Sequence, residues 1–166
     1  RRGAVFWFAF EAAVLAAPGE GSPPEARVSA PIRVLAAEDN PANRRVLAAL
    51  LAASPIDLVF AEDGAQAIDA WRAEAFDLVL MDVNMPVLDG VAAVARIRQL
   101  EAAAPQSRPR TPIWMLTANV FDDDVARYRA DGADGVLRKP IDTAALFALL
   151  AQVAEAKTGA EQRVTA

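Results

Sequence analysis

One short stretch, Val79 to Pro86, constrains the fold and the chemistry of this 166-residue chain more than any other. Its apolar run, Val79-Leu80-Met81, ends abruptly at the carboxylate of Asp82, and a turn containing Pro86 follows. A short apolar run bounded by turn signals is typical of a strand buried on both faces of a parallel sheet. In such sheets, chemistry gathers at the carboxyl ends of the strands. The stretch therefore predicts a buried strand with Asp82 as a reactive group at its end.

From residue 32 onward, short apolar runs alternate with segments of helical spacing. Strands are expected over residues 32–37, 56–61, 76–81, 112–116 and 135–138. Helices are expected over residues 42–53, 65–74, 90–104, 122–130 and 143–156. This alternation predicts an α/β fold, a doubly wound five-stranded parallel sheet with helices on both faces. In the first helix, Val46, Ala49 and Leu50 are expected to form the apolar face.

Right-handed crossovers place the carboxyl ends of all five strands at one edge of the sheet. The polar side chains expected at that edge are Glu38, Asp39, Asp82, Thr117 and Lys139. Three carboxylates brought together repel one another, and a bound cation removes the conflict. Oxygen donors without nitrogen or sulfur suit Mg²⁺. The expected ligands are Glu38, Asp39 and Asp82, with the backbone carbonyl of Asn84 as a further oxygen.

The remaining groups at this edge suit phosphoryl chemistry. The ammonium of Lys139 and the hydroxyl of Thr117 could join Mg²⁺ in neutralising the oxygens of a phosphoryl group on Asp82. Phosphoryl transfer needs mainly positioning and charge stabilisation, so this small set of groups would suffice. Asp82 would be the covalent nucleophile, and the small side chain of Ala118 would leave room for the incoming group.

Composition excludes several other kinds of chemistry. The chain has no cysteine and no histidine, and its formal net charge is −5. Disulfides, thiolate or histidine metal sites, a Ser-His-Asp triad and a phosphohistidine within these residues are therefore excluded. The negative charge and the lack of a long basic run argue against nucleic acid or an anionic membrane as the main partner.

The first 31 residues differ in composition from the rest of the chain. Residues 3–10 form an apolar, aromatic run that is too short to span a bilayer and is typical of a strand. Residues 18–31 are rich in Pro, Gly, Ser and Glu, which is linker composition. The expected organisation is thus a remnant of a preceding module (1–17), a linker (18–31), one domain (32–156) and a frayed tail (157–166).

The motifs at the strand ends resemble those of a known family. They are Glu38-Asp39-Asn40-Pro41, Leu80 to Pro86 with Asp89-Gly90, Leu116 to Asn119, Gly132-Ala133-Asp134, and Lys139-Pro140-Ile141-Asp142. In order and spacing they resemble the receiver domains of two-component signalling, particularly those attached to hybrid sensor histidine kinases. The resemblance covers residues 32–156 and implies the flavodoxin-like receiver fold. Residues 3–8 resemble the last strand of a histidine-kinase ATP-binding domain, which would be the preceding module.

The resemblance also implies roles and partners. Asp82 would accept a phosphoryl group from the phosphohistidine of a kinase dimerisation domain or a histidine phosphotransfer protein. Glu38 and Asp39 would hold Mg²⁺, Thr117 would switch on phosphorylation, and Lys139 would pair with the phosphoryl group. The Lys139-Pro140 bond would be cis. The domain would promote only the phosphorylation and dephosphorylation of its own aspartate, whereas the parent chain would be a histidine kinase.

Location and assembly follow from the same resemblance. Because phosphoryl donors are cytoplasmic, the domain is expected in the cytoplasm, with a parent protein that is either soluble or anchored in a membrane. No direct membrane contact is expected from residues 1–166. A homodimer remains open.

One departure from the family and two alternative functions also remain open. Receivers commonly carry Tyr or Phe three residues before the lysine, where Val136 stands here, so a ring-flip switch at that position is excluded. A haloacid-dehalogenase type of phosphohydrolase also uses an aspartyl phosphate, but its general acid/base lies two residues after the nucleophile, where this chain has Asn84. A pseudo-receiver that binds partners without being phosphorylated is the other alternative.

Several side chains near these motifs receive structural interpretations. Arg44 and Arg45 are expected on an exposed helix face, with partner docking as the alternative. Arg110 is expected in a solvated loop. Trp71 and Trp114 are expected to pack in or near the core.

Overall fold

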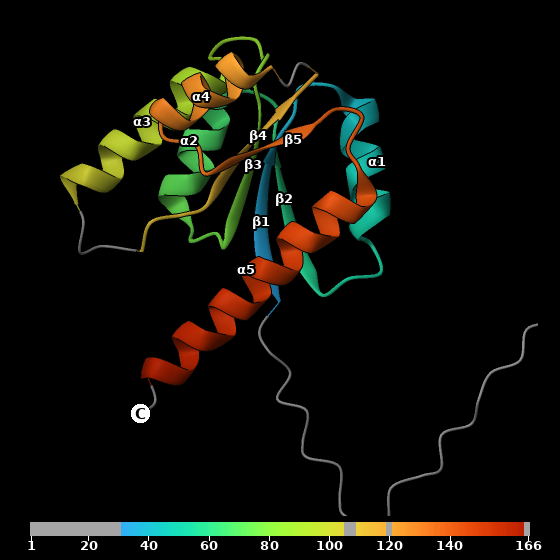
Figure 1. Cartoon of the computed structure of the whole chain (residues 1–166), viewed down its shortest axis with the longest axis vertical. Coiled ribbons are helices and arrows are strands. Elements are labelled where there is room, and N and C mark those ends of the chain that lie inside the picture. The colour runs from blue at the N-terminus through green and yellow to red at the C-terminus, as the bar shows by residue number, and fades with distance from the viewer. Residues whose placement is uncertain (1–30, 105–108, 119–120, 165–166) are drawn as a thin grey trace, which may run out of the picture.

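The structure is a computed structural model that describes residues 31–104, 109–118 and 121–164. These residues form one parallel sheet of five strands in the order β2-β1-β3-β4-β5 (Figure 1). Strands β1 to β5 span Ile32–Ala37, Ile56–Ala61, Leu78–Asp82, Ile113–Thr117 and Gly135–Arg138. Helices α1 to α5 span Pro41–Leu51, Gly64–Ala73, Gly90–Ala103, Asp122–Ala130 and Thr143–Val164. The predicted doubly wound, five-stranded parallel α/β fold is confirmed.

The helices cover the sheet in two layers. Figure 1 shows α1 and α5 on one face and α2, α3 and α4 on the other. Side chains alternate along the central strands, so that Val79 and Met81 face the second layer whereas Leu78 and Leu80 face the first. All five residues of β3 are buried. This double burial explains why the strand reads as an unbroken apolar run up to Asp82.

Helix starts follow closely after strand ends because short polar side chains cap them. Asn40, Asp63 and Asp89 accept hydrogen bonds from backbone N–H groups in the first turns of α1, α2 and α3. Asp142 does the same for α5. Such caps satisfy amide groups that the helix itself leaves without partners. They keep the strand-to-helix connections short and fix the loops that surround the carboxyl edge of the sheet.

Two predictions about helices were wrong. Val46 was expected on the apolar face of α1, but its side chain is 58% exposed, and Leu47 and Leu51 are buried instead. The buried face of α1 is therefore shifted by one residue from the predicted apolar face, from Val46 and Leu50 to Leu47 and Leu51. The expected frayed tail from Lys157 is helical, because α5 continues to Val164.

The far end of α5 contacts the place where the chain enters the sheet. Lys157 Nζ lies 2.9 Å from the carbonyl oxygen of Pro31 and 2.8 Å from Asp77 Oδ2. These bonds hold the last turns of α5 against the start of β1 and β3. Within the described residues, no helix combines the length and apolar character needed to cross a membrane.

Candidate functional site

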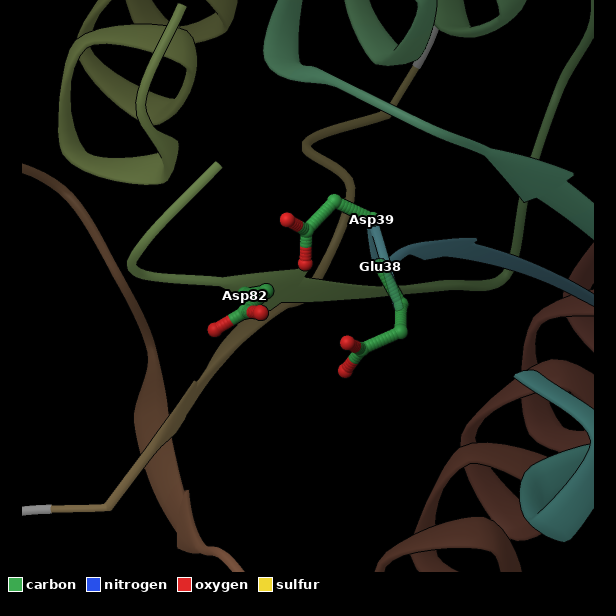
Figure 2. A group of neighbouring side chains, drawn as sticks. All are labelled: Glu38, Asp39 and Asp82. Carbon is green, nitrogen blue, oxygen red and sulfur yellow. The ribbon is translucent and has the colours of Figure 1, made fainter. Parts of the chain in front are cut away.

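The carboxyl edge of the sheet brings together the five polar residues predicted there. Glu38 and Asp39 directly follow β1, and Asp82 is the last residue of the neighbouring strand β3. Thr117 ends β4, and Lys139 follows β5. Figure 2 shows Glu38, Asp39 and Asp82 gathered at the ends of their strands. One carboxylate oxygen from each of these three lies within 4.8 Å of the other two.

Lys139 is the cation of this cluster. Its Nζ lies 2.6 Å from Asp82 Oδ2 and 2.6 Å from Glu38 Oε2. Glu38 and Asp82 are buried, whereas Asp39 is exposed. Within the part of the chain that the structure describes, the Asp39 carboxylate takes part in no ion pair. One ammonium therefore pairs with two of the three neighbouring carboxylates, and the cluster is short of positive charge.

The surroundings shift the protonation of both members of the central ion pair. Burial raises the pKa of the Asp82 carboxyl above its ordinary value, and the Lys139 ammonium only partly opposes that rise. The nearby Glu38 carboxylate raises the pKa of Asp82 further. For Lys139, burial lowers the pKa, but hydrogen bonds to Asp82 and Glu38 outweigh it, so the net pKa is raised. Lys139 is thus held as a cation, and Asp82 favours additional positive charge.

Two residues that support the acidic pair were not assigned to the site from the sequence. Asn43 donates from Nδ2 to Glu38 Oε1 over 2.9 Å. Arg44 Nη1 lies 2.9 Å from the carbonyl oxygens of both Glu38 and Asp39, while Nη2 pairs with Glu62. The expected exposed helix face holds for Arg45 but is wrong for Arg44. The short spacing from Asp39 to Arg44 was the available signal, since one helical turn brings the guanidinium back over the strand end.

Other parts of the site fix its geometry through the backbone. The Lys139 amide donates to the carbonyl of Thr117 over 2.7 Å, which joins the ends of β5 and β4. The Thr117 side chain is buried, as a hydroxyl inside the site requires. At the start of α3, a Cβ on Gly90 would lie 2.0 Å from the carbonyl oxygen of Asp82, so only glycine fits there. The Lys139-Pro140 bond is cis, as predicted.

The donor set fits a hard divalent cation. Mg²⁺ prefers carboxylate, carbonyl and water oxygens, and this edge offers three carboxylates within one small volume. Asp39 is the best placed to bind the cation directly, because its carboxylate takes part in no ion pair among the described residues, whereas both oxygens of Glu38 and of Asp82 already contact donor groups. The backbone N–H of Asn84 donates to Asp82 Oδ1 over 3.3 Å. The role of the Asn84 carbonyl as a ligand stays a prediction.

Large apolar side chains are exposed around this edge. Among the described residues, Val46, Val87, Phe121 and Phe147 are the large hydrophobic residues that are exposed. All four lie in loops after strand ends or in the first two turns of the following helices. Val87 is 85% exposed and adopts a positive φ of 66°, an uncommon conformation for a β-branched residue. Val87 and Phe121, in the loops that follow β3 and β4, therefore expose apolar side chains at the edge of the sheet that carries the buried charged cluster.

Comparison with known proteins places these features in a family. Residues 34–151 match the response regulator receiver domain. The sensor histidine kinase AruS of Pseudomonas aeruginosa is 39% identical over 141 residues, which cover 84% of this chain and 14% of that protein. The virulence sensor protein BvgS of Bordetella pertussis is 37% identical over 136 residues, 82% of this chain and 11% of that protein. This chain therefore spans only a small part of the curated relatives it matches.

Solved structures agree with this match. A receiver domain from a Pseudomonas aeruginosa sensor histidine kinase, with magnesium coordinated in its active-site cleft, is 33% identical with a TM-score of 0.66. The match covers 76% of this chain and 99% of that one. A receiver domain crystallised with the Saccharomyces cerevisiae histidine phosphotransfer protein is 30% identical with a TM-score of 0.67, covering 72% and 86%. The chain belongs to the response regulator receiver family and is similar to the receiver regions of hybrid sensor histidine kinases.

Proposed function

We propose that this domain is the phosphoacceptor of a two-component phosphorelay and that Asp82 carries the phosphoryl group. The observation that carries the proposal is the buried Asp82 carboxylate, 2.6 Å from Lys139 Nζ and clustered with Glu38 and Asp39. Aspartyl phosphate formation needs an available carboxylate and positive charge around the transferred group. Both are present at this edge, and family membership supports the same chemistry.

In the proposed reaction, a carboxylate oxygen of Asp82 attacks the phosphorus of a phosphoimidazole. The new P–O bond forms as the P–N bond breaks, and the imidazole nitrogen keeps the bonding electron pair. Because the other ring nitrogen of the donor carries a proton, the leaving group is a neutral imidazole. Lys139 would move from the free carboxylate to a phosphoryl oxygen, and the Thr117 hydroxyl would donate to another. Asp39 and Asp82, with Glu38 close behind them, would hold Mg²⁺, which supplies positive charge to the phosphoryl oxygens.

We further propose that the phosphoryl donor is a protein. The chain has no histidine, so the phosphohistidine must come from outside residues 1–166. The exposed side chains of Val87 and Phe121, in the loops after β3 and β4, give a protein partner apolar groups at the edge that carries Asp82. A kinase dimerisation domain or a histidine phosphotransfer protein would fit, and a receiver of similar fold was crystallised with such a protein. A hybrid histidine kinase is the proposed parent, with this domain in the cytoplasm.

Intact-mass analysis after incubation with acetyl phosphate and Mg²⁺ tests the proposal. Wild-type chain should gain one phosphoryl adduct that hydroxylamine removes, because acyl phosphates react with this nucleophile. Asp82→Asn should gain none. Asp69→Asn is the matched control, since Asp69 is exposed on α2 and is not a member of the carboxylate cluster, and it should label as wild type does.

Three outcomes would overturn the proposal. Undiminished labelling of Asp82→Asn would place the phosphoryl group elsewhere. A folded wild-type chain that neither labels nor binds beryllofluoride with Mg²⁺ would instead be a pseudo-receiver. Continuous release of phosphate from a small phosphoester at the same site would favour the phosphohydrolase alternative.

A further inference from the structure

A groove lies at the opposite end of the sheet from Asp82. It has a volume of about 510 Å³ and is lined by residues at the start of β3, at the start of β4 and in the middle of α5. Its lining is mainly apolar and includes Phe76, Pro112, Trp114, Val153, Ala156 and Lys157. Phe76 is buried, whereas Trp114 is only half-buried because the groove opens beside it. The phosphoacceptor chemistry uses none of these residues.

The chain enters the described structure beside this groove. The carbonyl of Pro31 accepts a hydrogen bond from Lys157, which lines the groove, and Lys157 also pairs with Asp77. Asp77 in turn lies against the first strand, since Asp77 Oδ2 accepts from the Arg33 amide over 2.8 Å. Figure 1 shows the far half of α5 running past the start of β1. Pro31, the first residue that the structure describes, therefore contacts the rim of the groove.

The composition of that segment matches the groove. Residues 23–30 read Pro-Pro-Glu-Ala-Arg-Val-Ser-Ala, with two prolines and a valine as the largest apolar groups. Proline-rich segments bind aromatic-lined grooves at a low entropic cost because their extended helix is largely preformed. The groove lies under β3 and β4, up to two strand spacings or about 10 Å from β1. Three extended residues span about that distance, and Val28 precedes Pro31 by three residues in the sequence.

We propose that residues 23–30 of the linker dock in this groove, with the two prolines and Val28 against Phe76 and Trp114. Docking would leave only residues 18–22 of the linker free between the receiver and the module that precedes it. The receiver would then sit at a set position next to that module and would not swing on a long tether. A shorter free tether changes the effective concentration at which a linked donor meets Asp82.

Limited proteolysis of the 166-residue chain tests the docking without any phosphoryl donor. Trypsin cleaves after Arg27, inside the docked segment, and after Arg2, outside it. Cleavage reports how often a segment opens. We expect the Arg27–Val28 bond to be cut at least about tenfold more slowly than in a free peptide of residues 18–31. Cleavage at Arg2–Gly3 provides the internal reference.

Substitutions on α5 show whether the groove is responsible. Ala156 lines the groove and is exposed, so Ala156→Glu should obstruct docking without disturbing the core and speed Arg27–Val28 cleavage about tenfold. Ala151→Glu is the matched control, because Ala151 is exposed on the same helix but does not line the groove. Pro24→Ser in the linker should speed cleavage as well. Equal urea midpoints would show that every variant is folded.

Four results at the Arg27–Val28 bond would overturn the proposal. They are cleavage at the free-peptide rate in wild type, protection unchanged by Ala156→Glu, equal acceleration by Ala151→Glu, and protection that grows with protein concentration. The last result would assign the groove to a second copy of the chain. Acceleration at Arg2–Gly3 in place of Arg27–Val28 would assign it to the apolar segment 3–10 and would also contradict docking of the linker.

Discussion

The two ends of the sheet both carry clusters of charge, but they are arranged differently. At the amino end, Arg33 pairs with Asp57 and Glu74, and Lys157 pairs with Asp77. Each of these carboxylates has a cationic partner, and their side chains are between 25% and 51% exposed. At the carboxyl end, Lys139 serves the buried carboxylates of Glu38 and Asp82, while Asp39 lies beside them.

The difference separates charges that hold the fold from charges that await a ligand. Exposed, paired charges contribute modestly to stability and are screened by solvent. A buried cluster that lacks positive charge is unfavourable on its own, so it indicates a site where a cation or another charged group completes the arrangement. Charge at the amino end should therefore matter for stability, and charge at the carboxyl end for binding and transfer.

The largest expected effect is that of Lys139→Met on transfer. Removing the one ammonium beside Asp82 should slow phosphoryl incorporation by about 100-fold or more, because positive charge near the transferred group stabilises the transition state. Mg²⁺ binding should persist, since the carboxylates remain. Rates of labelling by acetyl phosphate, measured at saturating Mg²⁺, check this. A rate within a few-fold of wild type would remove Lys139 from the transfer step.

Asp77→Ala is the counterpart at the amino end. The substitution removes the acceptor of the Arg33 amide and the partner of Lys157, so unfolding free energy should fall by about 2 kcal/mol. Labelling of Asp82 in the folded variant should match wild type. Urea unfolding and labelling rates measure the two effects, and a labelling defect as large as that of Lys139→Met would break the contrast between the two ends.

Whereas Asp77→Ala should lower the free energy of unfolding, Asp82→Asn should raise it by a smaller amount when Mg²⁺ is absent. Because burial raises the pKa of Asp82, the native state binds this proton more tightly than the unfolded chain does. The protonated Asp82 carboxyl therefore stabilises the folded state, and this contribution is complete below the ordinary carboxyl pKa of 3.8. The contribution is lost as the pH rises through the raised pKa of Asp82 in the folded state. At neutral pH the asparagine variant should therefore be the more stable one.

The pH dependence provides the check. Urea midpoints of wild type and Asp82→Asn in EDTA should converge as pH falls towards 4, where both side chains are neutral. Asp57→Asn, at the amino end, should change the midpoint little, since its ion pair is half exposed. A wild type more stable than Asp82→Asn at neutral pH would contradict the account of the cluster.

The sequence predicts most of the fold because its signals are local. The bounds of β1, β2, α4 and β5 agree with the predicted ranges, since apolar runs there stop at polar or turn residues. Local patterns fail where tertiary packing decides. Val46 and Leu47 are adjacent in the sequence and both are apolar. Only the position of α1 against the sheet determines that Leu47 is the buried one. The extension of α5 similarly depends on the contact of Lys157 with Pro31 and Asp77.

The sequence predicted which residues form the candidate site, but it did not predict the hydrogen bonds and ion pairs that neighbouring residues make. Strand-end positions brought Glu38, Asp39, Asp82, Thr117 and Lys139 to one edge, as expected. The contacts of Arg44 with two backbone carbonyls were missed, because carbonyl positions cannot be read from side-chain patterns. Arg110 is exposed in a loop, as predicted, but its ion pair with Asp134, which is distant in sequence, was not predicted. The half-buried Trp114 and buried Trp71 agree with prediction.

Calorimetric titration of Mg²⁺ tests the central claim most directly, namely that the carboxyl end is the end that lacks positive charge. Wild type and Asp57→Asn should each bind one Mg²⁺ with similar affinity. Asp82→Asn should bind at least about tenfold more weakly, because a carboxylate beside the ion is lost. If Asp82→Asn binds Mg²⁺ as tightly as wild type, or if Asp57→Asn weakens binding as much, the assignment of the metal site to the Asp82 edge is contradicted.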